Sequence, residues 1–180
     1  MAEETKSPFR IRYATVEDNA LLAEVGTETF YNSFAVDNTP ENMAVYLAES
    51  FNPQKLAREL GNPASRFLIV EAGSLTAAYA HLRFGQAPTT VAGRQPMEIA
   101  RFYARLPWIG KGVGALLMQA CLREAERAGC DVVWLDVWER NQRAITFYLR
   151  WGFAQVGTQV FQLGDDPQRD LLMAKDISPA

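Results

Sequence analysis

Residues 97–129, MEIARFYARLPWIGKGVGALLMQACLREAERAG, decide the fold because they predict a strand, a glycine-rich turn and a helix in succession. Met97 to Ala104 has the composition of a strand. From Val113 to Ala128 apolar residues recur at helical intervals, and Gly129 ends the helix. The turn GKGVGA at 110–115 lets backbone N–H groups at the helix start approach an anion, because its small residues leave the backbone open.

The segments on both sides of this stretch predict a mixed α/β chain. Before it we expect a strand at Phe9 to Ala14, followed by two or three helices that start at Thr15, Thr39-Pro40 and Asn52-Pro53. A hairpin of two strands, Arg66 to Ala72 and Leu75 to Phe84, comes next. After it we expect a buried strand at Asp131 to Val137 and a short helix at Asn141 to Trp151. Two strands, Ala154 to Leu163 and Leu171 to Asp176, follow the helix. The predicted class is α/β (α+β), with a mixed sheet of about seven strands flanked by helices.

Length and composition fit one domain over residues 1–180, with residues 1–8 as a flexible N-terminus. The net charge of −3 argues against a nucleic-acid binder, and no membrane span or secretory signal is visible. Two cysteines are too few for a disulfide framework, so we expect a reducing, cytoplasmic location. The charge is uneven: residues 1–90 carry −4 and residues 91–180 carry +1.

Two other anion-binding motifs compete for the glycine-rich turn. A P-loop requires Gly-Lys followed by Ser or Thr, but Lys111 is followed by Gly112. A dinucleotide-binding turn matches Gly110, Gly112 and Ala115, although five residues separate the turn from its strand and a single βαβ unit follows. A dinucleotide binder therefore stays as an alternative.

A longer pattern runs from Phe102-Tyr103-Ala104 through Pro107 to Ile109 into the turn at 110–114. It resembles the acetyl-CoA signature of the GNAT superfamily of N-acetyltransferases. A second pattern, Asn141-x-x-Ala144-x-x-Phe147-Tyr148-x-x-x-Gly152-Phe153, is similar to the superfamily's other signature. Further segments at 28–30, 38–43, 137–141 and 172–175 resemble the bacterial spermine/spermidine N-acetyltransferases.

The resemblance implies a GNAT fold and acetyl-CoA as cosubstrate, with no metal. The residues it assigns to acetyl-CoA are Phe102, Tyr103, Ala104, Ile109, Gly110, Lys111, Gly112, Val113, Gly114, Ala115, Asn141 and Tyr148. Ile109 departs from the Arg or Gln usual in the family, and Lys111 could supply that positive charge. Backbone donors can hold a pyrophosphate whichever side chain stands there.

Two residues are predicted to be catalytic. By resemblance, Tyr148 protonates the departing thiolate of CoA. Glu98 is the candidate base, since an alkylamine with a pKa near 10.4 is almost fully protonated at pH 7. Glu98 lies four residues before Phe102, so regular alternation predicts both side chains on one face of the strand.

The expected acceptor is a small primary amine, with a polyamine such as spermidine or spermine preferred through the resemblance. Glu28 and Tyr31 are predicted to bind it, because carboxylates and aromatic rings suit a cation. Transfer is expected to be direct, since Cys121 and Cys130 look structural. A peptide or amino-acid acceptor and a CoA-binding sensor without turnover stay as alternatives, and the resemblance permits a homodimer.

Overall fold

The computed structural model describes residues 8–177, so the expected flexible N-terminus, apart from Pro8, lies outside the described residues. Within this range seven strands form one mixed sheet, in the order β1 (Phe9–Tyr13), β2 (Ser65–Ala72), β3 (Leu75–Phe84), β4 (Pro96–Ala104), β5 (Val132–Trp138), β7 (Asp166–Asp176) and β6 (Ala154–Leu163). The helices are α1 (Asn19–Phe34), α2 (Pro40–Ser50), α3 (Pro53–Leu60), α4 (Val113–Arg127) and α5 (Gln142–Arg150). The predicted class and element order are confirmed, with the third N-terminal helix start realised as α3.

Helices α2 and α3 begin where the sequence predicts because polar side chains cap them. The start predicted at Thr15 is instead a 3-10 turn, and α1 begins at Asn19. Thr39 Oγ1 accepts a hydrogen bond from the backbone N–H of Asn42 at 3.3 Å, at the start of α2. Asn52 Oδ1 accepts from the N–H of Lys55 at 2.8 Å, at the start of α3. Each cap satisfies a backbone donor that the helix leaves unpaired.

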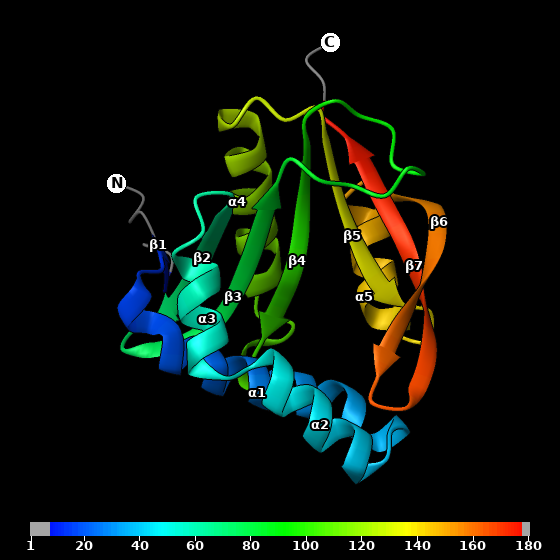
Figure 1. The fold of residues 1–180 in the computed structure, drawn as a ribbon. Helices are drawn as coiled ribbons and strands as arrows, with labels where there is room; N and C mark the ends of the chain where they lie inside the picture. The colour runs from blue at the N-terminus through cyan, green and yellow to red at the C-terminus, as the bar shows by residue number, and fades with distance from the viewer. Residues whose placement is uncertain (1–7, 178–180) are drawn as a thin grey trace.

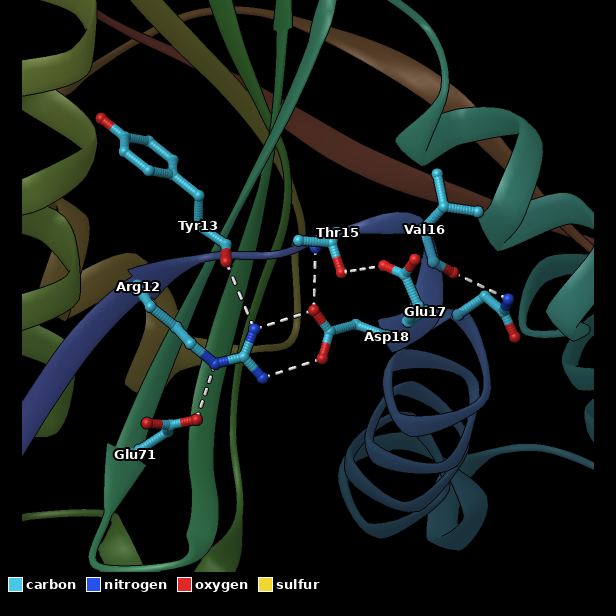
Figure 2. A network of polar contacts seen from close by, with 8 residues as sticks. Arg12, Tyr13, Thr15, Val16, Glu17, Asp18 and Glu71 are labelled. Carbon is cyan, nitrogen blue, oxygen red and sulfur yellow. Dashed lines mark hydrogen bonds and ion pairs between the residues drawn. The ribbon is translucent and has the colours of Figure 1, made fainter.

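The entry into α1 is fixed by one arginine that joins three elements (Figure 2). Arg12 of β1 forms a bidentate ion pair with Asp18 at 2.8 Å, and its Nε donates to Glu71 of β2 at 2.6 Å. Asp18 also accepts from the backbone N–H of Thr15 at 2.8 Å. The chain therefore leaves β1 through a 3-10 turn, Val16–Asp18, before α1 begins.

Helices cover both faces of the sheet (Figure 1). On one face, α4 and α5 pack over β2 to β5 through a large apolar cluster that includes Leu82, Leu117 and Tyr148. On the other face, α1 and α3 pack over β2 and β3 through a second cluster that includes Leu22, Leu56 and Tyr79. Within residues 8–177, no helix combines the length and apolar character needed to cross a bilayer.

The last strand is longer than predicted. β7 begins at Asp166, five residues before the expected start at Leu171, and pairs with β6 down to Leu163. The added residues are polar and include Pro167, so they lack the apolar alternation that signals a strand. A tight turn through Gly164, with φ +57°, returns the chain directly and imposes the pairing.

The feature that shapes the functional part of the molecule is the separation of β4 and β5. These strands pair in parallel only over Pro96–Glu98, opposite residues 132–134. Beyond that point they diverge, as Figure 1 shows, and α1 and α2 cross beside the open end of the sheet. The remaining residues of β4, 99–104, pair with β3 alone.

A β-bulge in β4 changes which side chains share a face. Ile99 pairs with Leu82 and Arg101 with His81, so Ala100 is an extra residue. Glu98 then lies opposite Arg83 and Phe102 opposite Ala80, two β3 residues that point to opposite faces. The prediction that Glu98 and Phe102 share a face is therefore wrong, because alternation holds only in an unbulged strand.

We predict that Gly26→Ala destabilises the fold through steric overlap. A Cβ at Gly26 of α1 would lie 2.3 Å from a ring carbon of Phe51 and 2.8 Å from Tyr79 Oη, and both of these side chains are buried. Over-packing of this kind costs roughly 1–3 kcal/mol. Urea denaturation would measure it, with Gly61→Ala as control, since a Cβ there meets nothing closer than 3.4 Å. Equal stability of the two variants would contradict the prediction.

Candidate active site

A cavity of about 580 Å³ opens between the diverging strands β4 and β5. Most of the residues predicted for the site line it, namely Glu98, Phe102, Tyr103, Ala104, Ile109, Gly110, Gly112, Val113, Gly114, Ala115, Asn141 and Tyr148. Lys111, Glu28 and Tyr31 do not. The fold thus brings the two sequence patterns, separated by about thirty residues, to one concave surface.

The glycine-rich turn forms one end of the cavity. Gly110 and Gly112 have φ values of +79° and +86°, the left-handed region that favours glycine. α4 starts directly afterwards at Val113, so the N–H groups of its first turn have no intrahelical acceptor. Free N–H groups together with the positive end of a helix dipole can bind a phosphate or pyrophosphate group.

The edge of β4 that faces β5 forms an adjoining wall. Because β5 pairs with β4 only as far as Glu98, the backbone groups of residues 99–104 on that side lack a strand partner. Phe102, Tyr103 and Ala104 line the cavity along this edge. An extended ligand with amide groups can pair here as an added strand would.

Asn141 and Lys111 differ in what they offer a ligand. Asn141 caps α5, its Oδ1 accepting from the N–H of Ala144 at 3.1 Å, and its amide NH₂ is a further donor on the cavity wall. Lys111 Nζ lies 5.4 Å from the ring centre of Trp108, outside the cavity lining. In this arrangement the lysine contacts the Trp108 ring rather than the cavity wall.

Tyr148 is almost fully buried, with 7% of its surface exposed, and packs edge-to-face against Phe102 and Phe153. Burial raises the pKa of its phenol above the ordinary value of 10, and the charge of Asp136 acts in the same direction. The phenol is therefore protonated at neutral pH, which is the form that a proton donor needs.

Glu98 is also buried, and it has a cationic partner. Arg83 Nη2 donates to Glu98 Oε1 at 2.5 Å, across the β3–β4 pair. Burial raises the pKa of Glu98 above its ordinary value, although Arg83 opposes this shift. A raised pKa makes the carboxylate a better base for an amine.

Three further acids line the cavity and were not predicted: Glu59 of α3, which pairs with Arg101, Asp136 of β5 and Asp170 of β7. Asp136 Oδ2 accepts from Gln159 Nε2 at 2.6 Å, and burial raises the pKa of Asp136. Burial and the charges of Asp136 and Glu139 raise the pKa of Asp170 to about 7. In sequence Asp136 stands inside an apolar strand, which is the signal that could have identified it, whereas Asp170 ends a polar stretch that gives no such signal.

The predicted acceptor residues lie elsewhere. Glu24 and Glu28 of α1 both form ion pairs with Arg105, at 2.5 and 2.9 Å, and Tyr31 is more than half exposed. The next turn of α1 faces the cavity instead, through Thr29, Phe30, Ser33 and Phe34. The helix is positioned as expected, but a different stripe of it forms the wall.

The single histidine lines the cavity, whereas the two cysteines do not. His81 stacks on Phe67 with ring centres 4.0 Å apart and contacts Ser65 Oγ at 3.1 Å. Burial, reinforced by Arg101, lowers the pKa of His81 to about 2, so the ring is neutral. Cys121 and Cys130 are buried and do not line the cavity. Among residues 8–177, no three His, Cys, Asp or Glu converge as metal ligands would.

Comparison with known sequences identifies relatives over most of the chain. A profile of the acetyltransferase (GNAT) family matches residues 27–153. An uncharacterized N-acetyltransferase encoded in the pepI 3′ region of Lactobacillus delbrueckii subsp. lactis is 34% identical over 153 residues, which are 85% of this chain and 88% of the relative. An uncharacterized N-acetyltransferase of Mycobacterium tuberculosis is 29% identical over 87% of this chain and 96% of its own length.

Solved structures of similar fold include two with CoA ligands. The PaiA N-acetyltransferase of Thermoplasma acidophilum, in complex with coenzyme A, superposes with a TM-score of 0.73 at 22% identity, covering 93% of this chain and 98% of that one. The yncA protein of Salmonella typhimurium, solved with acetyl-CoA, has a TM-score of 0.66 at 20% identity, covering 97% and 96%. At these identities the likeness establishes the fold.

The pKa of Asp170 predicts that its removal stabilises the protein. The folded state holds a proton on Asp170 up to about pH 7, whereas an unfolded Asp releases it near pH 4, so the free energy of unfolding falls as the pH rises between these values. Asp170→Asn removes this loss, and we expect it to be more stable than the wild type at pH 8, by up to about 4 kcal/mol. At pH 4 the two should be equal.

Thermal or urea unfolding at both pH values would measure the effect. Asp165→Asn, on the exposed turn between β6 and β7, is the matched control and should change stability little at either pH. An Asp170→Asn variant that is less stable than the wild type at pH 8 would contradict the prediction.

Proposed function

The chain belongs to the GNAT family of acetyltransferases, and from this membership we propose that it transfers the acetyl group of acetyl-CoA directly to a primary amine of a small molecule. The observation that carries the proposal is one cavity lined by the glycine-rich turn, the unpaired edge of β4 and Tyr148. The glycine-rich turn of this cavity suits an anion, and its wall also carries Asp136 and Asp170, neither of which forms an ion pair among the described residues. A donor with phosphates and an acceptor with a positive charge can therefore meet in it.

The residues present fit acetyl-CoA. The first turn of α4 and the glycines at 110 and 112 would hold the pyrophosphate, with backbone N–H groups rather than side chains as donors. Phe102 and Ala104 would pair with the amide-containing arm along the open edge of β4. Bound acetyl-CoA supplies the activated acetyl group as a thioester, and backbone donors of β4 would polarise its carbonyl.

Tyr148 would give its proton to the thiolate that leaves when the amine attacks. Its phenol is protonated at neutral pH and buried beside Phe102. The CoA thiol would be buried in the same cavity, and burial raises the pKa of a thiol as well. The pKa difference between the phenol and this thiol is therefore smaller than it would be for a thiol in water. Glu98, directly or through a water molecule, would accept the proton that the ammonium form of the acceptor must lose.

For the acceptor we prefer a polyamine such as spermidine or spermine. The support is the acidic and aromatic character of the wall formed by α1, α2 and strands β5 to β7, together with the sequence resemblance to polyamine acetyltransferases. The alternatives, a peptide or amino-acid amine, a CoA sensor without turnover and a dinucleotide binder, give different results in the following assay.

Purified protein with acetyl-CoA should release free CoA thiol in the presence of at least one amine from a panel of polyamines, amino acids, arylalkylamines and peptides. We expect the fastest release with spermidine or spermine. Thermal shift with CoA and with NAD provides the binding control. CoA binding without turnover on any amine would favour the sensor, and stabilisation by NAD alone would favour the dinucleotide binder.

Tyr148→Phe should lower kcat roughly 100-fold while the affinity for acetyl-CoA stays unchanged, because the ring packing is kept and only the proton donor is removed. Steady-state kinetics and calorimetry with CoA would measure both quantities. Tyr13→Phe, on the far side of α4 where the hydroxyl donates to Glu124, is the control. A normal kcat in Tyr148→Phe would remove this tyrosine from the mechanism.

A further inference from the structure

The two aspartates in the cavity share one face of the sheet. In the antiparallel ladder Asp136 lies opposite Leu172, and Asp170 lies opposite Trp138 on one side and Gln159 on the other. Because side chains alternate along each strand, Asp136, Asp170 and Gln159 all project from the face that lines the cavity. Two carboxylates from adjacent strands therefore lie near each other on one cavity wall.

The two carboxylates are not equally satisfied. Asp136 accepts a hydrogen bond from Gln159, at 2.6 Å. Asp170 has 6% of its surface exposed. Its Oδ1 is shielded from solvent and has no hydrogen-bond partner among the described residues. A buried carboxylate oxygen without a donor costs free energy, and a donor from a ligand would remove that cost.

Cationic side chains of the protein do not fill this role. Arg83 and Arg101, which line the cavity from β3 and β4, pair with Glu98 and Glu59 at 2.5 Å. Lys55 of α3 and Arg143 of α5 also lie on the wall. Among the residues that the structure describes, none of these four forms an ion pair with Asp136 or Asp170.

Aromatic rings complete the surroundings of the pair. The cavity wall near these strands carries Phe34, Tyr46, Trp138 and Phe161. Tyr46 lies between Phe30 and Phe161, with ring centres at 4.4 and 5.2 Å. Rings beside carboxylates suit a cation that is attached to an apolar chain, because the ring faces attract the charge and the chain loses its contact with water.

We propose that Asp170 and Asp136 form the ammonium-binding subsite for the acceptor, with the unpartnered Oδ1 of Asp170 accepting a hydrogen bond from a primary ammonium group and the aromatic rings enclosing its alkyl chain. This deepens the proposed function and rests on it for the identity of the cosubstrate. Gln159 positions Asp136 through its hydrogen bond. The acceptor class is an alkylamine that is cationic in solution, in preference to a neutral or anionic one.

Binding of simple probes to the full-length protein tests this subsite without turnover. The wild type, with and without CoA, would be titrated with 1-aminobutane, spermidine and the neutral 1-butanol. Calorimetry or ligand-observed NMR would measure binding. We expect both amines to bind and 1-butanol to bind at least tenfold more weakly. Asp170→Asn should weaken amine binding roughly 30-fold or more, because a buried charge partner is lost.

Matched variants separate this role from a structural one. Asp165→Asn makes the same change on an exposed turn and should bind the amines normally, and Asp136→Asn should weaken them as Asp170→Asn does. CoA affinity should be unchanged in all three. Unfolding measurements would establish that each variant is folded.

Two results would overturn the subsite: equal amine affinity in the wild type, Asp136→Asn and Asp170→Asn, or wild-type protein that binds neither amine at millimolar concentration. Failure of the proposed function gives a different result, since the wild type would then bind no CoA or transfer no acetyl group while the amine titrations still report on the aspartates.

Discussion

The separation of β4 from β5 is the constraint on which the functional part of the molecule depends. Parallel pairing lasts only from Pro96 to Glu98, and the bulge at Ala100 follows immediately. Unpaired backbone groups inside a protein are costly unless water or a ligand satisfies them, so an open strand edge is stable only where it lines a cavity. The same separation places the N-terminus of α4 and the start of α5 at the two sides of this opening.

The bulge also places Phe102 and Glu98 on opposite faces of the sheet. Phe102 projects toward α5 and contacts Tyr148, whereas Glu98 projects toward the face covered by α1 and α3, where it pairs with Arg83. An unbulged strand would have placed both side chains on one face. With the bulge, Glu98 and the Phe102–Tyr148 pair reach one cavity from opposite faces of the sheet.

The cavity holds several acidic side chains whose burial costs folding free energy. Glu98 and Asp170 are buried, Asp136 near them is partly buried, and in each of them burial raises the carboxyl pKa. Burying carboxylates beside one another opposes folding, and such arrangements concentrate at sites where a ligand or a reaction uses the charge. The glycine-rich turn and the first turn of α4 line the same cavity, so these acidic side chains and a helix N-terminus share one surface.

The sequence by itself determined the element order, the helix caps, the glycine-rich turn and the family, because each of these depends on local patterns of apolar, polar and small residues. It also identified Tyr148, and most of the site residues that it predicted line the cavity. The tertiary structure decided the bulge at Ala100, the pairing of Arg105 with α1 that directs Glu28 away from the cavity, and the convergence of Asp136 with Asp170. These features depend on strand register and on contacts between residues distant in sequence, and no local pattern contains that information.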